Sequence, residues 1–406
     1  MAHDALIGRL EPGQQAALAL LWSLLPDMRL VGGVVRDLLA GRSVADIDLA
    51  TPEPPEQVMQ RLRAHGVHVV ATGLQHGTVT AVLDGAPYEI TTLRCDEETD
   101  GRHAIVRWTQ DWREDALRRD FSMNAMSIDQ AGTVYDYFAG QADLAAGRVR
   151  FVGDPARRIE EDALRILRFF RFYGRYGRGR ADRRALDAIT RGVARLAGLS
   201  VERIWMELQR ILVGPNVAAI MRLMAQTGVL AHILPEGAAL ERCVRLVEYG
   251  APDNAVLRLA GLSENPPAVA HRLKLSRAEA GQLAAFGKPG PVPDTGMSED
   301  TLRRLVANEP HDVLDARIWL HQAAQPRTAA ENAAFTQLRD RLRRIETPVF
   351  PIAGRDVVAL GGHAGPEIGR IMGLVRQWWL DGGCHAGADA CRARIKHYLG
   401  AKAAQS

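Results

Sequence analysis

The sequence of 406 residues predicts an α+β fold, with a mixed β-sheet in its N-terminal third and helices in the remainder. Strand-like runs separated by turn residues recur as far as Gly140. After about Leu144, long runs rich in Ala, Leu and Arg are broken only by Gly and Pro, a pattern typical of helices. A chain of this length exceeds what one hydrophobic core fills, so we expect about two to four domains.

Changes in composition place the expected domain boundaries. We expect an α/β domain at residues 1–140 and helical segments at residues 141–213, 214–288 and 289–406. Gly214-Pro215 interrupts the first helical run, and the proline-rich stretch Lys288–Pro293 is the best linker candidate.

Arginine is unusually frequent in this chain. Of the 51 basic residues, 47 are Arg, although the net charge is only +3. Between Gly147 and Ala185 there are twelve Arg and five acidic residues, a local excess of seven positive charges. Such an excess indicates a polyanionic partner, because an average surface mixes both signs of charge. A solvated helical face is the alternative interpretation.

The cysteines and the hydropathy of the sequence indicate in which cellular compartment we expect the protein. The four cysteines have no spacing that indicates a disulfide framework, so we expect a reducing, cytoplasmic setting. The longest early apolar run, Ala16–Leu25, lacks a preceding basic flank and is too short to span a bilayer. We therefore expect no targeting segment and no membrane role.

The first expected helix and strand lead into a glycine turn that would bind phosphate. We expect a helix at Glu11–Leu25 and a strand at Met28–Val31. Gly32 and Gly33 follow this strand and precede the amphipathic sequence VVRDLLAG, so the chain is expected to run from strand through a tight turn into a helix. Backbone amides at such a helix start favour anions.

Two aspartates follow on the next expected strand, Ala45–Ala50. The two-residue period of a strand would place Asp46 and Asp48 on one face. Neighbouring carboxylates repel one another unless a cation lies between them, so they predict a divalent metal site. Oxygen ligands suit Mg²⁺, and they accept Mn²⁺ as readily.

A helix at Pro54–His65 and a hairpin follow. The expected hairpin strands Val79–Leu83 and Tyr88–Leu93 flank the turn sequence Asp84–Pro87. If the second strand neighbours that of the aspartates, Glu89 is either a third carboxylate near the metal or, as we prefer, a structural partner in the sheet.

The segment from Arg94 to Trp112 is polar, charged and too long for an idle connection, so we expect a functional loop there. A helix is expected at Trp112–Asp120. A second hairpin is expected at Ser127–Asp129 and Val134–Phe138, around Gln130-Ala131-Gly132.

The sequence EDALRILRFFR, from Glu161 to Arg171, predicts a helix with one charged and one apolar face. Its charged face would carry Asp162, Arg165, Arg168 and Arg171 at steps of three residues. These side chains would reach one ligand, or they would form ion pairs on a solvated helix.

Five segments, taken together, resemble the class II tRNA nucleotidyltransferases, the family of CCA-adding enzymes and poly(A) polymerases within the polymerase-β-like superfamily. They are GGVVRD with DID, ATGLQHGTV, RRDFSMNA, EDALRILR and SVERIWMELQRIL, and they cover about half of the chain. The C-terminal half shows no matching motif. The resemblance implies a polymerase-β-like nucleotidyltransferase head on a mixed sheet, followed by an all-α neck, body and tail, with the tail and a basic face binding the tRNA acceptor end.

The activity implied is template-independent transfer of CMP, CMP and AMP from CTP and ATP to a tRNA 3′ end, by two-metal chemistry with release of pyrophosphate. Asp46 and Asp48 would be the catalytic metal ligands. The implied nucleotide-binding residues are Gly33, Arg36, Arg119, Asp120, Asp162, Arg165, Arg168 and Arg171.

Some of these roles are more specific. Arg119 and Asp120 resemble the ribose and phosphate contacts of the family, with Asn124 as a helper, although Asp120 or Ser122 would also suit a helix cap. We expect Asp37 to brace Arg36 rather than bind metal. Arg203, near a helix start, is expected to have a structural role.

Asp162 and Arg165 provide a physical route to base selection. A carboxylate accepts hydrogen bonds and a guanidinium donates them, so the pair suits an edge with an amino group beside a ring acceptor. Cytosine and adenine both present that edge. Uracil and guanine present a carbonyl instead, and the unpaired carboxylate would cost about 1–3 kcal/mol.

The alternatives are an A-adding enzyme or a poly(A) polymerase of the same family, and a tRNA-binding protein without catalysis. The segment LQHGTV after Gly73 lacks the basic run that the polymerases place in this region, and the loop at Arg94–Trp112 disfavours a CC-only enzyme. The intact acidic pair disfavours a non-catalytic protein. The sequence does not indicate an oligomeric state.

Two further patterns invite a metal-site interpretation that we do not adopt. His311-Asp312 matches the His-Asp pair of metal phosphohydrolases but has no surrounding His and Asp residues at the spacing of such a site. Cys384, His385, Cys391 and His397 fit no zinc-ligand spacing, so we expect ordinary buried and surface positions.

Overall fold

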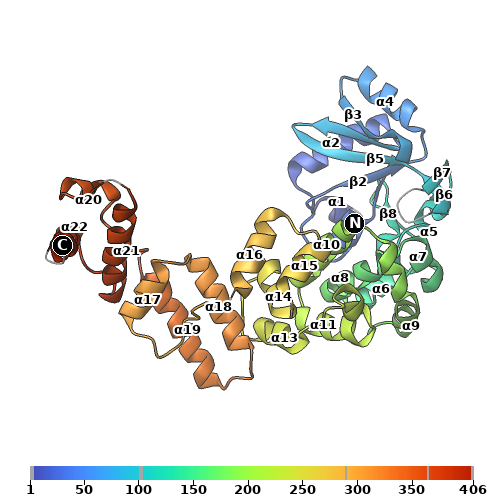
Figure 1. Ribbon diagram of the computed structural model, residues 1–406. Coiled ribbons are helices and arrows are strands. Elements are labelled where there is room, and N and C mark those ends of the chain that lie inside the picture. The colour runs from blue at the N-terminus through green and yellow to red at the C-terminus, as the bar shows by residue number, and fades with distance from the viewer. Residues whose placement is uncertain (1–3, 100–103, 289, 364, 404–406) are drawn as a thin grey trace. The chain divides into compact units, whose positions relative to one another are not determined.

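The computed structural model describes residues 4–99, 104–288, 290–363 and 365–403. The chain divides into two compact units, Met1–Pro235 and Glu236–Ser406. Within the described residues, every strand belongs to the N-terminal unit (Figure 1). The predicted change from a mixed sheet to helices is therefore confirmed.

The N-terminal unit is built on a seven-stranded sheet with the order β3-β4-β5-β2-β1-β8-β9. Its strands β2 and β5 are parallel, and the other neighbours are antiparallel, so the sheet is mixed as predicted. The strands of the described residues are β1 (Arg29–Val31), β2 (Asp48–Thr51), β3 (His68–Gly73), β4 (Thr78–Leu83), β5 (Ala86–Thr92), β6 (Arg94–Thr99), β7 (Ala104–Trp108), β8 (Met126–Ile128) and β9 (Val134–Asp136).

Both predicted hairpins are confirmed. Strands β4 and β5 pair around Asp84 and Gly85, whose φ angles of +49° and +79° are those of a two-residue primed turn. Strands β8 and β9 pair in the same way, with Gly132 at a φ of +77° in their connection. Turn chemistry in the sequence thus determines the register of these strands.

The segment from Arg94 to Trp112 is not the open loop that we expected. Strands β6 and β7 form a separate two-stranded sheet there, with Arg94 opposite Trp108 and Cys95 opposite Arg107. Pairing satisfies backbone groups that a loop would leave to water. The connection at residues 100–103 lies outside the described residues.

The helices expected in the N-terminal unit are present, with small differences at their ends. Helix α5 ends at Leu117 and not at Asp120, because the following residues extend and pair with a neighbouring segment. The Ser122 amide donates to the Arg150 carbonyl at 2.9 Å, and the Val152 amide donates to the Asp120 carbonyl at 3.0 Å.

The helices of this unit, with their 3₁₀ turns, are α1 (Asp4–Ile7), α2 (Pro12–Leu24), α3 (Gly33–Leu39), α4 (Pro55–Ala64), η1 (Leu74–His76), α5 (Trp112–Leu117), η2 (Ser122–Asn124), α6 (Gly140–Ala146), α7 (Pro155–Glu161), α8 (Arg165–Tyr176), α9 (Arg183–Gly192), η3 (Val193–Gly198), α10 (Val201–Leu212), α11 (Val217–Gln226) and α12 (Val229–Ile233).

An aromatic cluster joins the end of the sheet region to helix α8. Phe169 is fully buried and lies 5.9 Å from Phe151, 6.4 Å from Phe121 and 5.5 Å from Phe170, measured between ring centroids. Offset and edge-on contacts of this kind add to the free energy of burial. The cluster fixes α8 beside the segment that precedes η2.

The C-terminal unit is helical throughout its described residues. Its helices are α13 (Leu240–Glu248), α14 (Ala255–Leu262), α15 (Pro266–Arg272), α16 (Arg277–Gly287), α17 (Glu299–Val306), α18 (His311–Ala323), α19 (Ala329–Arg344), α20 (Gly354–Ala359), α21 (Pro366–Asp381) and α22 (Ala388–Ala403). The predicted linker falls between α16 and α17, where the described residues have no regular structure. No helix in the described part of the chain is both long and apolar enough to cross a bilayer.

The two discounted metal patterns have structural roles. Cys384 and Cys391 are buried in the core of α20, α21 and α22, and His385 contacts Asp300 at 2.7 Å. His311 and Asp312 form the first turn of α18. Throughout the described residues, no three His, Cys, Asp or Glu side chains gather as a metal site, and all four cysteines are free thiols.

Phe169→Ala should lower the free energy of unfolding of the N-terminal unit by about 3–5 kcal/mol, because it removes a ring from a filled aromatic core. Met206→Ala on α10 is the control, since Met206 is 52% exposed. It should change stability by no more than about 0.5 kcal/mol. Urea denaturation followed by circular dichroism measures both values, and equal losses in the two variants would contradict the assigned core.

Candidate active site

A cavity of about 460 Å³ opens in the N-terminal unit where the starts of α3 and β2 and the segment before η2 approach the start of α8. Most of the predicted site residues line it, namely Gly33, Arg36, Asp48, Arg119, Asp120, Asp162, Arg165 and Arg168. The two that do not are Asp46 and Arg171. Segments more than one hundred residues apart in the sequence therefore meet at one site.

The glycine turn leaves room at the cavity floor. Gly32 precedes α3 with a φ of +72°, a conformation that side chains other than glycine rarely adopt. A Cβ atom on Gly32 would lie 3.0 Å from Nη1 of Arg119, and one on Gly33 would lie 3.6 Å from Nη2 of Arg36. The missing side chain of Gly32 thus gives space to the Arg119 guanidinium, whereas a Cβ on Gly33 would make only an ordinary contact with Arg36.

Arg36 is 8% exposed and is held in place from several sides. Its Nη1 donates to Oδ1 of Asn124 at 2.6 Å, and its Nη2 donates to Oδ2 of Asp37 at 2.8 Å. The guanidinium also lies 5.0 Å from the ring centroid of Phe172 and 4.6 Å from that of Tyr176. The expectation that Asp37 braces Arg36 is confirmed.

The acidic pair lies at the start of β2. The strand begins at Asp48 and not at Ala45, so Asp46 precedes it, and the prediction that both aspartates share one strand is wrong. The reason is that the ladder between β2 and β5 starts at Asp48 opposite Glu89, which leaves Asp46 without a strand partner. The strand of Glu89 therefore neighbours that of Asp48, which is the condition under which either role of Glu89 was expected.

Electrostatics connect the two aspartates. Burial raises the pKa of Asp48, and the negative charge of Asp46 raises it further, whereas Arg119 and Arg36 act in the opposite direction. The net shift is upward. A cation beside Asp48 would therefore relieve both the desolvation of this carboxylate and its repulsion by Asp46.

Asp120 lies at the back of the cavity and accepts hydrogen bonds on both oxygens. Oδ1 accepts from the Phe121 amide at 2.8 Å and from Nδ2 of Asn124 at 2.9 Å, and Oδ2 accepts from Nε of Arg168 at 2.7 Å. Burial alone would raise the pKa of Asp120, but the charge of Arg168 and these hydrogen bonds outweigh it and lower the pKa.

The structure does not place Asp162 on the helix of Arg165. Helix α7 ends at Glu161, and α8 begins at Arg165, so the prediction of one continuous charged face is wrong. The break arises because Oδ1 of Asp162 accepts the Leu164 amide at 3.0 Å, a local hydrogen bond that competes with the helix.

Asp162 and Arg165 nevertheless both line the cavity, each held by a different partner. Oδ2 of Asp162 accepts from Nη2 of Arg203 at 2.9 Å, which agrees with the bracing role expected for Arg203. Arg165 donates to Oε2 of Glu161 at 2.8 Å and to the Arg118 carbonyl at 2.9 Å. The two side chains are thus fixed independently of each other.

Two further arginines of α8, Arg168 and Arg171, are bound to Glu207 of α10. Nε of Arg171 donates to Oε2 of Glu207 at 2.6 Å, and Arg168 lies 3.8 Å from the same carboxylate. Glu207 is 3% exposed. Arg171 therefore contributes to the support behind the cavity.

The carboxylates that support the site were missed in the sequence. Asp115 is buried and binds Arg118 and Arg119 at 2.7 and 3.1 Å. Its spacing of three and four residues from these arginines is a helical signal that would have indicated it. Glu207 has a similar spacing from Arg203 and Arg210 on its own helix, and it lies 3.6 Å from Arg210. This spacing gives no indication of its contact with Arg171, which precedes it by 36 residues.

Comparison with known families gives two matches. Residues 28–150 match the family described as "Poly A polymerase head domain". Residues 182–240 match the family described as "Probable RNA and SrmB- binding site of polymerase A". The first match contains the acidic pair and Asp120, and the second contains Glu207.

Curated relatives extend the similarity over most of the chain. The mitochondrial CCA tRNA nucleotidyltransferase 1 of Danio rerio is 36% identical over 371 residues, which cover 87% of this chain and 83% of the relative. The human protein of the same name is 36% identical over 385 residues, which cover 91% and 86%. The CCA-adding enzyme of Geobacillus stearothermophilus is 38% identical over 242 residues, 58% of each chain.

Solved structures share the fold. The CCA-adding enzyme of Bacillus stearothermophilus in complex with CTP has a TM-score of 0.78 at 26% identity, with 98% of this chain and 100% of that chain covered. The CCA-adding enzyme of Thermotoga maritima complexed with tRNA has a TM-score of 0.70 at 21% identity, with 98% of both chains covered.

Asp120→Asn should lower the free energy of unfolding by about 1–3 kcal/mol at neutral pH, because a buried ionic partner of Arg168 is lost. The folded pKa of Asp120 lies below its ordinary value of 3.8, so the ionic stabilisation is complete above about pH 4 and is lost as pH falls through the folded pKa. Urea denaturation from pH 7 to pH 3 should show the two proteins converging.

Asp27→Asn is the matched control, since Asp27 is an exposed turn residue. It should leave stability unchanged at every pH. A deficit of Asp120→Asn that stays constant down to pH 3 would contradict the ionic role.

Proposed function

The chain belongs to the family of CCA-adding tRNA nucleotidyltransferases, and from this membership and its cavity we propose that it adds CMP, CMP and AMP to the 3′ end of tRNA. The reaction uses CTP and ATP, releases pyrophosphate and needs no nucleic-acid template. The observation that carries the proposal is that one cavity is lined by arginines from four segments and by the carboxylates of Asp48, Asp120 and Asp162.

Asp46 and Asp48 are proposed as the residues that hold the divalent cations used by nucleotidyltransferases. Two carboxylates fit such a group, because Mg²⁺ commonly binds one or two carboxylates together with substrate phosphates and water. The raised pKa of Asp48 also favours a cation at this position, since a nearby positive charge would offset the burial of the carboxylate. When bound, the cation neutralises triphosphate charge and activates the attacking hydroxyl. We propose Mg²⁺, and Mn²⁺ suits the same ligands.

The protein's own contribution at the phosphates is to fix positive charge before the substrate arrives. Arg36 uses three of its five N–H donors on Asp37 and Asn124, so its remaining donors face the cavity from a fixed position. Gly33 lets the backbone approach the ligand, and Arg119 adds a second guanidinium beside Asp48. A prearranged site of this kind does not need to reorganise during transfer.

Asp120 is proposed to recognise the ribose. Its oxygens already accept bonds from the Phe121 amide, Asn124 and Arg168, which together occupy the capacity of a carboxylate. A sugar hydroxyl would therefore replace one of the two Arg168 hydrogen bonds, because Arg168 is the most exposed of these three partners. Arg168 would then be released toward the nucleotide.

Base selection is proposed to rest on Asp162 and Arg165. Asp162 uses two acceptor positions on Leu164 and Arg203, so two remain for an amino group of the base. Arg165 uses three donors on Glu161 and two carbonyl groups, and two remain for a ring acceptor. Cytosine and adenine satisfy both side chains, whereas uracil and guanine present a carbonyl oxygen to Asp162, which is itself an acceptor.

Arg171 and the helical segments complete the proposal. Arg171 acts through Glu207, which positions Arg168, and not by contact with the nucleotide.

We assign residues 1–140 to the catalytic head, 141–213 to the neck, 214–288 to the body and 289–406 to a tail that binds the tRNA acceptor arm. A cytoplasmic location is proposed from the free cysteines, although the vertebrate relatives are named as mitochondrial.

The direct test supplies a tRNA that ends before CCA, Mg²⁺ and one labelled nucleotide at a time. We expect incorporation of C, followed by A once both C residues are present, and none of U or G. Incorporation of A alone would show an A-adding enzyme or a poly(A) polymerase. No incorporation with normal tRNA binding would show a non-catalytic tRNA-binding protein.

Asp46→Ala and Asp48→Ala should each abolish incorporation while leaving the affinity for tRNA largely intact, because the carboxylates act on the triphosphate. Transfer is measured with labelled CTP, and affinity is measured by filter binding. Asp27→Ala is the control and should retain both properties. Weakened tRNA binding with normal transfer would reverse the assignment.

Asp162→Asn should reduce the preference for CTP over UTP by about 5- to 150-fold, equivalent to the 1–3 kcal/mol cost of an unpaired carboxylate. The amide offers a donor to the uracil carbonyl, so UTP is no longer penalised. Asp187→Asn on the exposed side of α9 is the control. An unchanged ratio of kcat/KM values in an active Asp162→Asn enzyme would refute selection by this side chain.

A further inference from the structure

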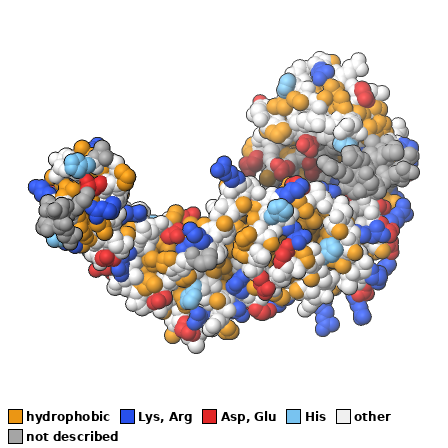
Figure 2. Space-filling view, in the orientation of Figure 1, with side chains coloured by type: hydrophobic (Ala, Val, Ile, Leu, Met, Phe, Trp, Pro, Cys, Tyr) orange, Lys and Arg blue, Asp and Glu red, His pale blue; other side chains and the backbone are white. Residues whose placement is uncertain are grey.

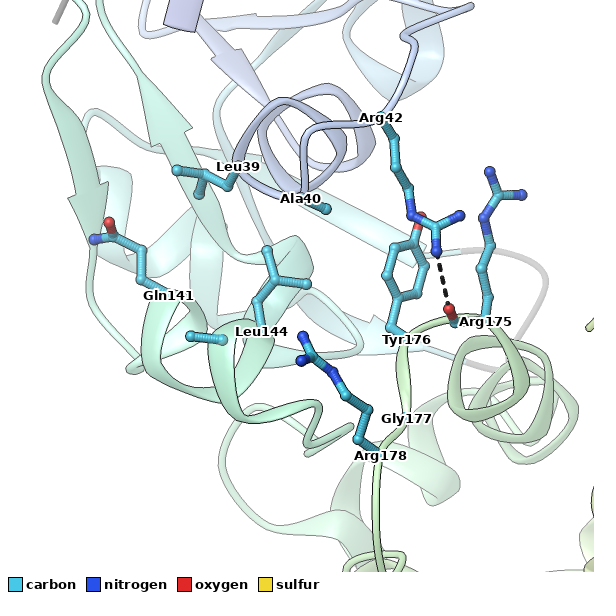
Figure 3. Close-up of a pocket in the computed structure, with 10 residues that line it drawn as sticks. Leu39, Ala40, Arg42, Gln141, Leu144, Arg175, Tyr176, Gly177 and Arg178 are labelled. Atoms are coloured by element: carbon cyan, nitrogen blue, oxygen red, sulfur yellow. Dashed lines mark hydrogen bonds between the residues drawn. The ribbon is translucent and has the colours of Figure 1, made fainter. Parts of the chain in front are cut away.

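A second cavity, of about 620 Å³, lies in the N-terminal unit between the end of α3, helix α6 and the end of α8 (Figure 3). It shares no lining residue with the candidate active site. Nothing proposed above for nucleotidyl transfer uses it.

Three guanidinium groups and no carboxylate line this second cavity. The arginines are Arg42, Arg175 and Arg178, and none of them has an ion pair within the described residues. Figure 3 shows Arg42, which follows α3, beside Arg175 at the end of α8, and Arg178, which follows α8. Like charges that share a cavity repel, so the arrangement favours an anionic ligand.

Most of the arginine-rich stretch, in contrast, has carboxylate partners. Eight of the twelve arginines between Gly147 and Ala185 pair with carboxylates of the same unit. The four without such a pair among the described residues are Arg175, Arg178, Arg180 and Arg184. On the face drawn in Figure 2, other basic side chains project singly from the region of α7 and α9.

The walls of the second cavity are ordered by specific contacts. Nη2 of Arg42 donates to the Arg175 carbonyl at 3.2 Å, and its guanidinium lies 5.0 Å from the ring centroid of Tyr176. The Arg178 amide donates to the Gly147 carbonyl at 2.8 Å. Gly147 has a φ of +66°, and a Cβ atom there would lie 2.6 Å from Cβ of Arg178, so glycine is required for this approach.

The opposite wall is apolar. Leu39 of α3 and Leu144 and Ala145 of α6 line it, with the amide side chain of Gln141 beside them (Figure 3). The cavity therefore has a cationic side and an apolar side with one amide. Its volume is in the usual range for small ligands.

We propose that this cavity binds a phosphate-bearing ligand of nucleotide size, separate from the transfer site. The phosphate contacts Arg42, Arg175 and Arg178, since guanidinium groups match phosphate oxygens with paired hydrogen bonds. The sugar or base rests against Leu39 and Leu144. The same chemistry is offered by one nucleotide of an RNA strand and by a free nucleotide.

The test replaces the three arginines by glutamine (R42Q, R175Q and R178Q) and measures binding without turnover. The probes are a tRNA that ends before CCA, titrated at several salt concentrations, and ATP, titrated by calorimetry. If an RNA nucleotide occupies the cavity, tRNA affinity should fall about tenfold or more, and the dependence of log affinity on log salt should lose a slope of about two to three. If a free nucleotide occupies it, ATP binding beyond the transfer site should disappear.

The matched control carries R180Q, R184Q and R191Q, which remove the same charge from exposed positions of the same unit. Equal effects in control and test variants, or no effect of the test variant on either probe, would overturn the proposal.

A145E supplies a second variant that keeps all three arginines and places a carboxylate in the exposed wall. It should reproduce the binding loss, and normal binding by a folded A145E protein would also overturn the site. Incorporation of nucleotides is not measured, so failure here leaves the transfer activity untouched.

Discussion

Burial of charge in matched pairs is the constraint on which the active-site region depends. Three carboxylates that are almost inaccessible to water, Asp115, Asp120 and Glu207, each bind at least one cavity arginine or its neighbour. Charges removed from water are tolerated only when paired, so neither member of a pair can be lost alone without a large cost. The benefit is geometric. The guanidinium groups that face the cavity are held from behind, with part of their hydrogen-bonding capacity left for a ligand.

The same pairs explain why strands and helices form one compact unit up to Pro235. Asp120, which follows α5, is bonded to Arg168 of α8, and Phe121 beside it packs against Phe169. An ionic contact and an aromatic contact at adjacent residues therefore join the sheet region to the helices that follow. The cavity forms at this junction, where Gly33, Arg36 and Asp48 from the sheet region meet Asp162, Arg165 and Arg168 from the helices that follow.

What the sequence predicted correctly depended on local chemistry. The hairpin of β4 and β5 followed from Asp84-Gly85, whose backbone preferences do not depend on distant partners. Asp162 was placed wrongly because helical spacing continues through it, while its side chain caps the Leu164 amide and ends the helix. The contacts of Glu207 with Arg168 and Arg171 were not found because these two arginines lie on α8, whereas Glu207 lies on α10. Spacing within one element carries no information about contacts between elements.

Helix α8 lies between both cavities, which explains the length of its arginine run. Arg165, Arg168 and Phe172 face the active site, whereas Arg175 and Tyr176, one turn further, line the second cavity. The hydroxyl of Tyr176 donates to Asp37, and Asp37 in turn holds Arg36 in the active site. An anion that draws Arg42 or Arg175 away from the Tyr176 ring would act on the residue that supports Arg36. One helix thus lines both cavities, and Tyr176 at its end contacts both Arg42 and Asp37, the carboxylate that holds Arg36.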